Sequence, residues 1–161
     1  RQFTKRGYDA IHAEIERLWN EERPFVLEEI YEAAQLGDRS ENAAYIYGKQ
    51  RLRMIDKRLN VLRKKIKDVI VVDTDAQEAM DTVSFGALVT IENEEGEEFS
   101  YRLVDKEEVD PEKKWISVQS PMGKALLGRE EGDDIELHLP KGIKYYEIIS
   151  IHYGPDPKET S

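Results

Sequence analysis

The sequence predicts an α+β protein, in which a long antiparallel coiled-coil hairpin of helices precedes a compact, mainly antiparallel β domain with one short helix. Apolar residues recur every three or four positions through the first 69 residues, the period of a helix that buries one face. After residue 82, apolar and polar residues alternate in short runs separated by turn residues, as in paired strands. We therefore expect a hairpin over residues 1–73, a linker over 74–81, a β domain over 82–155 and a tail over 156–161.

The first helix of the hairpin is expected to follow Thr4, whose hydroxyl suits the N-cap position. Its early apolar face consists of Tyr8, Ile11, Ile15 and Leu18. Pro24 lies inside this helix and lacks a backbone N–H donor, so it predicts a kink or a short break.

The tip of the hairpin is expected at residues 37–42. Gly37 is a natural stop for the first helix, and Asp38 or Ser40 is a natural start for the second. The second helix carries an apolar series with alternating spacings of three and four, at Leu52, Ile55, Leu59, Leu62, Ile66 and Val69. Such a helix, about 27 residues long, spans roughly 40 Å. Because the connection is short, the two helices must run antiparallel.

The β domain should contain a hairpin around Gly96, a helix opened by Ser120 and Pro121, and a second hairpin around residues 140–142. The expected strands lie at residues 87–92, 98–104, 115–118, 135–139 and 145–153, with the short helix at 122–127.

Charge is unevenly distributed along the chain. Residues 1–72 hold 15 Lys and Arg against 12 Asp and Glu, whereas the remainder holds 9 against 22. This asymmetry indicates two surfaces with different partners. The absence of cysteine excludes disulfides and thiolate metal sites and agrees with a cytoplasmic location. No apolar run approaches the ~20 residues needed to span a bilayer, so no membrane partner is expected.

Two interpretations of the tip carboxylates, Asp38 and Glu41, remain open from the residues alone. In the first, they form a capping box that satisfies the N-terminus of the second helix. In the second, they offer hard oxygen ligands to a Mg²⁺ ion. Two oxygens do not close a metal site, so the second interpretation requires another molecule to supply the remaining ligands.

A basic run on the second helix also has two interpretations. Residues 49–67 contain nine basic residues and one acid, whereas residues 5–34 contain four basic and eight acidic residues. The run is either a solvated coiled-coil face or a surface that contacts nucleic acid. The histidines His12, His138 and His152 are scattered, and we expect no catalytic or zinc role for them.

Several motifs, in the same order along nearly the whole chain, resemble the bacterial Gre family of transcript cleavage factors, and among them the GreB type. The tip segment LGDRSENA at residues 36–43 is the most specific, and EERP at 21–24 precedes it. Tyr45, Tyr47 and residues 51–53 continue the match. In the second domain, ISVQSPM at 116–122, ALL at 125–127 and EGD at 131–133 resemble the family again.

The resemblance implies an FKBP-like second domain and a transcription elongation factor that acts on RNA polymerase without being an enzyme itself. Its hairpin would enter the secondary channel of the polymerase and stimulate endonucleolytic cleavage of backtracked RNA, rescuing arrested complexes. Asp38 and Glu41 would assist a Mg²⁺ shared with the polymerase, with Arg39 and Ser40 shaping the tip. The 3′ end of the RNA would contact a basic patch consisting of Lys49, Arg51, Arg53, Lys57 and Arg58. Docking on the channel rim would use Gln119, Ser120, Pro121 and Met122, and we expect a monomer.

Alternative functions remain. Ala44 stands where many relatives of the family carry an acidic residue, and Gln119 replaces an aspartate in the docking loop. A protein with these changes could instead occupy the channel and regulate or inhibit the polymerase without stimulating cleavage. A coiled-coil chaperone or prolyl isomerase that uses the β domain is a third interpretation, and a plain interaction module whose tip is only a capping box is a fourth.

Overall fold

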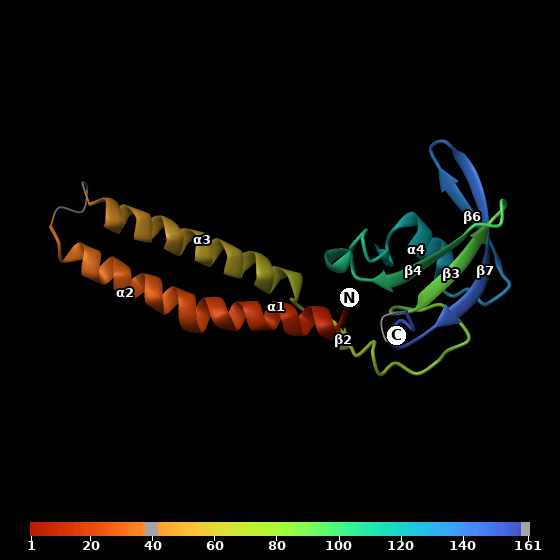
Figure 1. Cartoon of the computed structure of the whole chain (residues 1–161), viewed down its shortest axis with the longest axis horizontal. Coiled ribbons are helices and arrows are strands. Elements are labelled where there is room, and N and C mark those ends of the chain that lie inside the picture. The colour runs from red at the N-terminus through yellow and green to blue at the C-terminus, as the bar shows by residue number, and fades with distance from the viewer. Residues whose placement is uncertain (38–41, 159–161) are drawn as a thin grey trace. The chain divides into compact units, whose positions relative to one another are not determined.

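The computed structural model describes residues 1–37 and 42–158, and the chain divides into two compact units (Figure 1). One unit is formed by Tyr8–Lys67 and consists of helices. The other combines Arg1–Gly7 with Asp68–Ser161 and contains the strands. The predicted fold class, a helical hairpin followed by a mostly antiparallel β domain with one short α-helix, is confirmed.

The helical unit contains a continuous helical segment that pairs with one long helix. The segment comprises α1 (Lys5–Arg17), the π-helical turn η1 (Leu18–Glu22) and α2 (Arg23–Ala34), and it packs against α3 (Ala43–Lys65). The apolar seam between them is narrow, and its buried side chains are Leu18, Val26, Ile55, Leu59 and Leu62. The heptad series predicted for the second helix therefore lies in this seam from Ile55 to Leu62.

The sequence predicted a kink or a short break in the first helix at Pro24, and the structure has a π-helical turn directly before it, within a continuous helical segment. Pro24 lies in the first turn of α2, where it has no N–H to donate to a carbonyl of the preceding helical turn. Directly before it, the N–H of Arg23 bonds to the carbonyl of Leu18, five residues earlier, which is the pattern of a π-helix. Proline thus changes the local helix type.

The second helix starts later than predicted. Asn42 is the N-cap of α3, and its side chain accepts a hydrogen bond from the N–H of Tyr45. Helix α3 therefore begins at Ala43, whereas the sequence placed its start at Asp38 or Ser40, which lie outside the described residues. The helix has 23 residues, or roughly 35 Å, and ends before Asp68, whose φ is 56°.

Two short strands were missed at the ends of the predicted hairpin. Strand β1 (Gln2–Thr4) pairs in parallel with β2 (Ile70–Val72). Residues 1–7 and 68–73 consequently belong to the sheet-containing unit, whereas the predicted hairpin spanned 1–73. Ile66 and Val69 continue the helical spacing by coincidence, since the chain leaves α3 at Lys65.

The N-terminal strand is anchored by buried polar contacts. The N–H of Thr4 donates to Oε1 of Glu108 at 2.9 Å, and its hydroxyl contacts the other carboxylate oxygen. Thr4 also accepts from the N–H of Gly7 at 3.0 Å, so the predicted N-cap of α1 is confirmed. Burial raises the pKa of the Glu108 carboxyl, although the hydrogen bonds from Thr4 partly oppose this shift.

The remaining strands form one five-stranded sheet in the order β5-β4-β3-β7-β6. Its strands are β3 (Leu88–Asn93), β4 (Glu98–Val104), β5 (Trp115–Ser117), β6 (Asp134–Leu139) and β7 (Gly142–His152). All neighbours are antiparallel except β4 and β5. The β3–β4 turn places Gly96 at φ 82°, as the hairpin motif predicted, and a 3-10 turn, η2 (Lys106–Glu108), follows β4.

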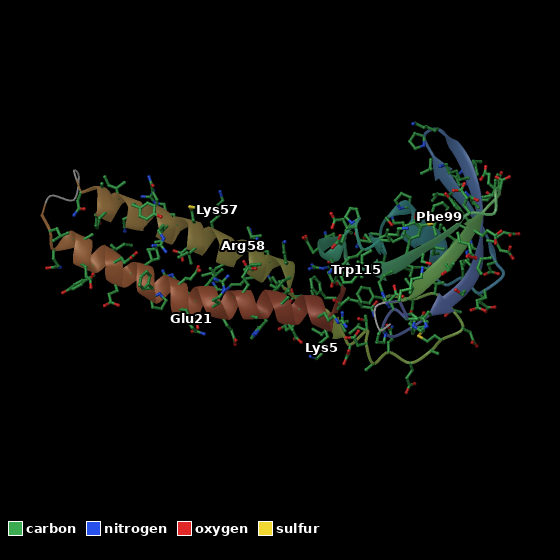
Figure 2. All side chains as sticks on the ribbon, viewed as in Figure 1. Lys5, Glu21, Lys57, Arg58, Phe99 and Trp115 are labelled. Atoms are coloured by element: carbon green, nitrogen blue, oxygen red, sulfur yellow. The ribbon has the colours of Figure 1, made fainter. Side chains whose placement is uncertain are left out.

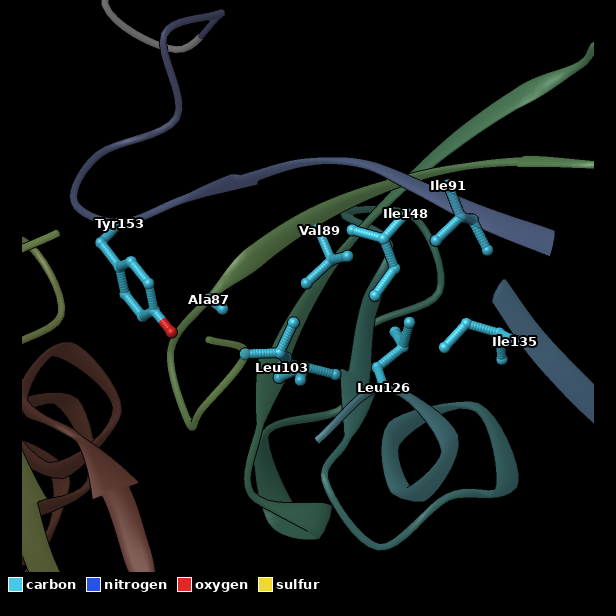
Figure 3. Close-up of a cluster of buried hydrophobic side chains, with 9 residues drawn as sticks. Ala87, Val89, Ile91, Leu103, Leu126, Ile135, Ile148 and Tyr153 are labelled. Atoms are coloured by element: carbon cyan, nitrogen blue, oxygen red, sulfur yellow. The ribbon is translucent and has the colours of Figure 1, made fainter. Parts of the chain in front are cut away.

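The core of this unit lies between the sheet and the short helix α4 (Pro121–Leu126). Val89, Leu103 and Ile148 from the strands converge on Leu126 from the helix, and all four are buried (Figure 3). Ser120 caps α4 by accepting from the N–H of Gly123 at 3.0 Å, as the Ser-Pro motif predicted. The core thus holds the 117–123 segment against the sheet.

Candidate functional site

The two ends of the hairpin's connecting segment are joined by one side chain. Nδ2 of Asn42 donates to the carbonyl oxygen of Ala33 at 2.6 Å, which satisfies a carbonyl in the last turn of α2. Gly37, at φ 131°, follows that helix, as expected for a glycine stop. The candidate residues Asp38, Arg39, Ser40 and Glu41 lie outside the described residues. What the structure establishes is that α2 and α3 are closed against each other at the point where this acidic segment connects them.

Within residues 1–37 and 42–158, the predicted basic patch divides into cations with a carboxylate partner and cations without one. Arg58 makes a bidentate contact with Glu14 of α1, at 2.9 and 3.1 Å, and Nη1 of Arg51 lies 2.9 Å from Glu29 of α2. The hydrogen bond from Arg58 lowers the pKa of Glu14. Both arginines therefore link α3 to the other helices of the hairpin. Each pair contributes only modestly to the stability of the hairpin, because its side chains are partly exposed.

The other three cations form a separate stripe. Lys49, Arg53 and Lys57 are spaced by four, so they follow one another along a single face of α3. Among the described residues, none of the three has a carboxylate within ion-pair distance. Figure 2 labels Lys57 and Arg58 on α3. Arg58 contacts Glu14, whereas Lys57 does not. The stripe is the part of the patch whose charge remains available to a ligand.

The predicted docking residues occupy the turn that enters α4. The side chains of Gln119 and Pro121 are exposed. Ser120 is half-buried, and its hydroxyl also donates to the carbonyl of Ser117 at 2.6 Å. Met122 packs against the core of the sheet unit. Ser120 and Met122 thus fix the turn, whereas Gln119 and Pro121 are exposed on its surface.

Neither a metal cluster nor a histidine centre occurs in the part of the chain that the structure describes. Across residues 1–37 and 42–158, no group of three or more His, Asp or Glu side chains is arranged to hold a metal ion. His12 stacks on Tyr8 within α1 at 5.9 Å, and His138 and His152 lie on different strands.

Family models match both halves of the chain. The model described as "Transcription elongation factor, N-terminal" matches residues 1–71, and the model described as "Transcription elongation factor, GreA/GreB, C-term" matches residues 76–153. The chain belongs to the GreA/GreB family. It is a transcription elongation factor that acts on RNA polymerase, as the sequence motifs indicated.

Similar proteins span almost the same length. The chain is 46% identical to the transcription elongation factor GreB of Yersinia pestis, covering 95% of this chain and 89% of that protein. It is 47% identical to GreB of Haemophilus ducreyi, covering 94% and 93%. A solved structure of GreA factor homolog 1 from Thermus thermophilus is 27% identical, covers 94% and 99%, and superposes with a TM-score of only 0.41.

Two pairs of an aromatic side chain with an arginine in this GreA/GreB family member were not predicted from the sequence. Trp19 lies 5.1 Å from the guanidinium of Arg23, and Tyr47 lies 5.7 Å from that of Arg51. In each pair the arginine follows the aromatic residue by four positions on a helix, which brings the side chains together. The spacing of four residues between aromatic and arginine was therefore the signal in the sequence that could have identified these pairs.

No helix among the described residues is both long and apolar enough to cross a membrane.

Proposed function

We propose that this GreA/GreB family member stimulates RNA polymerase to cleave backtracked RNA, by inserting the α2–α3 end of its hairpin into the secondary channel. The observation that carries the proposal is the closed hairpin end, where Asn42 bonds to Ala33 on either side of a short acidic segment. The polymerase remains the enzyme, and the chain acts in the cytoplasm as a monomeric cofactor protein that rescues arrested complexes.

In this proposal, Asp38 and Glu41 share a Mg²⁺ ion with the polymerase active site. Carboxylate oxygens suit Mg²⁺, which takes about six ligands and retains several waters. Two carboxylates leave most positions to the polymerase, the RNA and water. A second metal ion stabilises charge on the attacking and leaving oxygens of phosphodiester hydrolysis. Arg39 and Ser40 shape the same segment.

The 3′ end of the extruded RNA would meet the stripe of Lys49, Arg53 and Lys57. These cations have no described carboxylate partner, so their charge is available to phosphates. The sequence placed Arg51 and Arg58 in the same patch. Their main role in this proposal is to stabilise the hairpin, since both form ion pairs across it.

Docking on the rim of the channel would use the exposed part of the turn before α4. Gln119 and Pro121 are presented by a turn that Ser120 and Met122 hold in place. This segment belongs to the sheet-containing unit. In the proposal, the sheet-containing unit therefore binds polymerase, and the helical unit assists cleavage.

A cleavage assay on arrested complexes tests the proposal. Polymerase carrying backtracked RNA with a labelled 3′ segment is mixed with Mg²⁺ and with the wild-type protein or the Asp38→Asn/Glu41→Gln variant. We expect the wild type to release short 3′ fragments and the variant to be slower by about 100-fold, the scale expected when groups around a metal are removed.

A matched control removes two charges elsewhere. Glu94 and Glu95 lie exposed in the β3–β4 turn, so Glu94→Gln/Glu95→Gln should cleave like the wild type. Wild-type protein that binds polymerase but releases no fragment would contradict the proposal, and would identify a regulator that occupies the channel without assisting cleavage.

A further inference from the structure

A groove of about 440 Å³ lies between the end of α2 and the start of α3. Its volume is within the range of small-ligand sites, roughly 300–1,000 Å³. Gly48 and Ala33, which line the groove, are buried. Gly48 lets the two helices approach closely, because a Cβ atom there would lie 2.7 Å from Cγ1 of Ile30. Larger side chains, among them Tyr47 and Leu36, complete the lining.

The walls of the groove carry exposed apolar surface. Tyr47 on α3 is 61% exposed, and Leu36, which follows α2, is 80% exposed. Large side chains with this exposure cost solvation unless a partner covers them. Because they come from different helices and line the same groove, a flat ligand inserted there would contact both.

The Tyr47 ring is held in place by a cation that is itself neutralised. The guanidinium of Arg51 lies 5.7 Å from the ring centroid, and its Nη1 lies 2.9 Å from Glu29. Arg51 therefore stacks on the ring without leaving a net positive charge in the groove. Glu32, which is exposed, adds a carboxylate to the lining.

This charge pattern favours a base over a phosphate. The lining holds two carboxylates and one guanidinium, so it repels an anion but can accept hydrogen bonds from the exocyclic amines of a nucleobase. An aromatic ring beside an arginine is a platform on which unpaired bases stack in single-stranded RNA. The available cations, Lys49, Arg53 and Lys57, lie on another part of α3, where phosphates would be held.

We propose that the groove binds one unpaired nucleobase of the RNA strand, stacked on Tyr47. The inference rests on the proposed function for the source of that strand. The groove then takes a base while the stripe takes phosphates, so the chain holds the RNA by two chemically distinct contacts. Tyr47 is a positioning residue for the RNA in this scheme.

A photocrosslink tests the contact independently of cleavage. RNA with 5-iodouridine in its extruded 3′ segment is assembled into the arrested complex, bound by the full-length protein and irradiated. We expect a crosslink to Tyr47, found by peptide mass spectrometry and lost in Tyr47→Leu. Tyr31→Leu is the matched control, because Tyr31 is 68% exposed on α2 and does not line the groove. A crosslink that avoids Tyr47 at every position overturns the proposal, whether or not the protein stimulates cleavage.

A substitution cycle with abasic RNA distinguishes a base from a protein partner. On intact RNA, Tyr47→Leu should raise the concentration of factor needed for half-maximal cleavage by about fivefold, the low end of stacking energies, whereas Tyr47→Phe should match the wild type. With an abasic nucleotide at the crosslinked position, wild type and Tyr47→Leu should become equal. An equal loss on intact and abasic RNA overturns the proposal in favour of a contact with polymerase. If the wild type binds and crosslinks through Tyr47 but cleaves nothing, the proposed function fails while the base contact stands.

Discussion

The two units of the chain are stabilised in different ways. In the sheet-containing unit, strands and α4 surround a three-dimensional core that includes Val89, Leu103 and Ile148. In the helical unit, burial is confined to one seam between two layers of helix, and charged side chains bond across its edges. A narrow hairpin has few positions to bury, so most of its surface is free to carry charge and aromatic groups. That difference explains why the candidate RNA and metal residues lie in the hairpin and the candidate docking turn lies on the sheet unit.

The largest expected effect comes from removing one side chain of the seam. Leu59 is 1% exposed, and Leu59→Ala should destabilise the helical unit by about 2–5 kcal/mol through lost burial and a cavity. Because the chain divides into two compact units, the sheet unit should keep its stability. Far-ultraviolet circular dichroism during urea unfolding, which follows the helices, measures the loss.

Leu103→Ala, at a position 0% exposed in the sheet unit, provides the reciprocal change. It should lower the unfolding midpoint followed by near-ultraviolet signals of the sheet unit and leave the helical transition in place. If Leu59→Ala and Leu103→Ala shift both transitions equally, the two units unfold as one, and the comparison is wrong.

A smaller effect distinguishes Arg58, which is paired with Glu14, from Lys57, which has no carboxylate partner among the described residues. Arg58→Gln removes the bidentate contact with Glu14 and should destabilise the hairpin by about 0.2–1 kcal/mol. Lys57→Gln, at the neighbouring position without a described partner, should change stability by less than about 0.5 kcal/mol.

In RNA cleavage the order of the two effects should be reversed, so that Lys57→Gln changes the salt dependence of cleavage more than Arg58→Gln does. Lys57→Gln should weaken the dependence of cleavage on salt, because one phosphate contact is lost, and Arg58→Gln should not. Cleavage rates measured between low and moderate potassium chloride give the two slopes. Equal slopes would show that the division of the patch into bracing and binding cations is incorrect.

The smallest expected effect is a pair of opposite pH dependences, one in each unit. The hydrogen bond from Arg58 lowers the pKa of Glu14 from its ordinary 4.5, so the stability that this carboxylate contributes is lost as the pH falls through the lowered value. Burial raises the pKa of Glu108, so its contribution is present at low pH and is lost as the pH rises through the raised value. Carbon-detected NMR titration of the side-chain carboxyls should place Glu14 below 4.5 and Glu108 above it, and the reverse order would contradict both assignments.

Much of the fold was predictable because local signals agreed with the packing. Pro24 marked the change in helix type, Gly37 marked the end of α2, and Ser120 with Pro121 opened α4. The heptad from Ile55 to Leu62 matched the buried seam, since a helix that packs on one partner needs only one apolar stripe. The strands around Gly96 followed from alternation and a glycine turn.

What the sequence could not predict depends on contacts between distant residues. The N-cap of α3 is Asn42, whose amide also reaches Ala33 across the hairpin. The pairing of β1 with β2 joins residues 68 positions apart, and three-residue strands carry no periodic signal of their own. For the same reason, sequence alone grouped Arg51 with Lys57, whereas the partner Glu29 separates their roles.

The central claim is that the sheet unit holds polymerase and that the hairpin's acidic segment assists cleavage. Competition tests it most directly: arrested complexes receive a fixed amount of wild-type protein and increasing amounts of the Asp38→Asn/Glu41→Gln variant, and fragment release is measured. The variant should inhibit progressively and reach about half inhibition near equal concentrations, because it keeps the docking surface and lacks only the tip carboxylates. Release that stays constant at a large excess of the variant would contradict the claim, since the carboxylates would then be needed for binding itself.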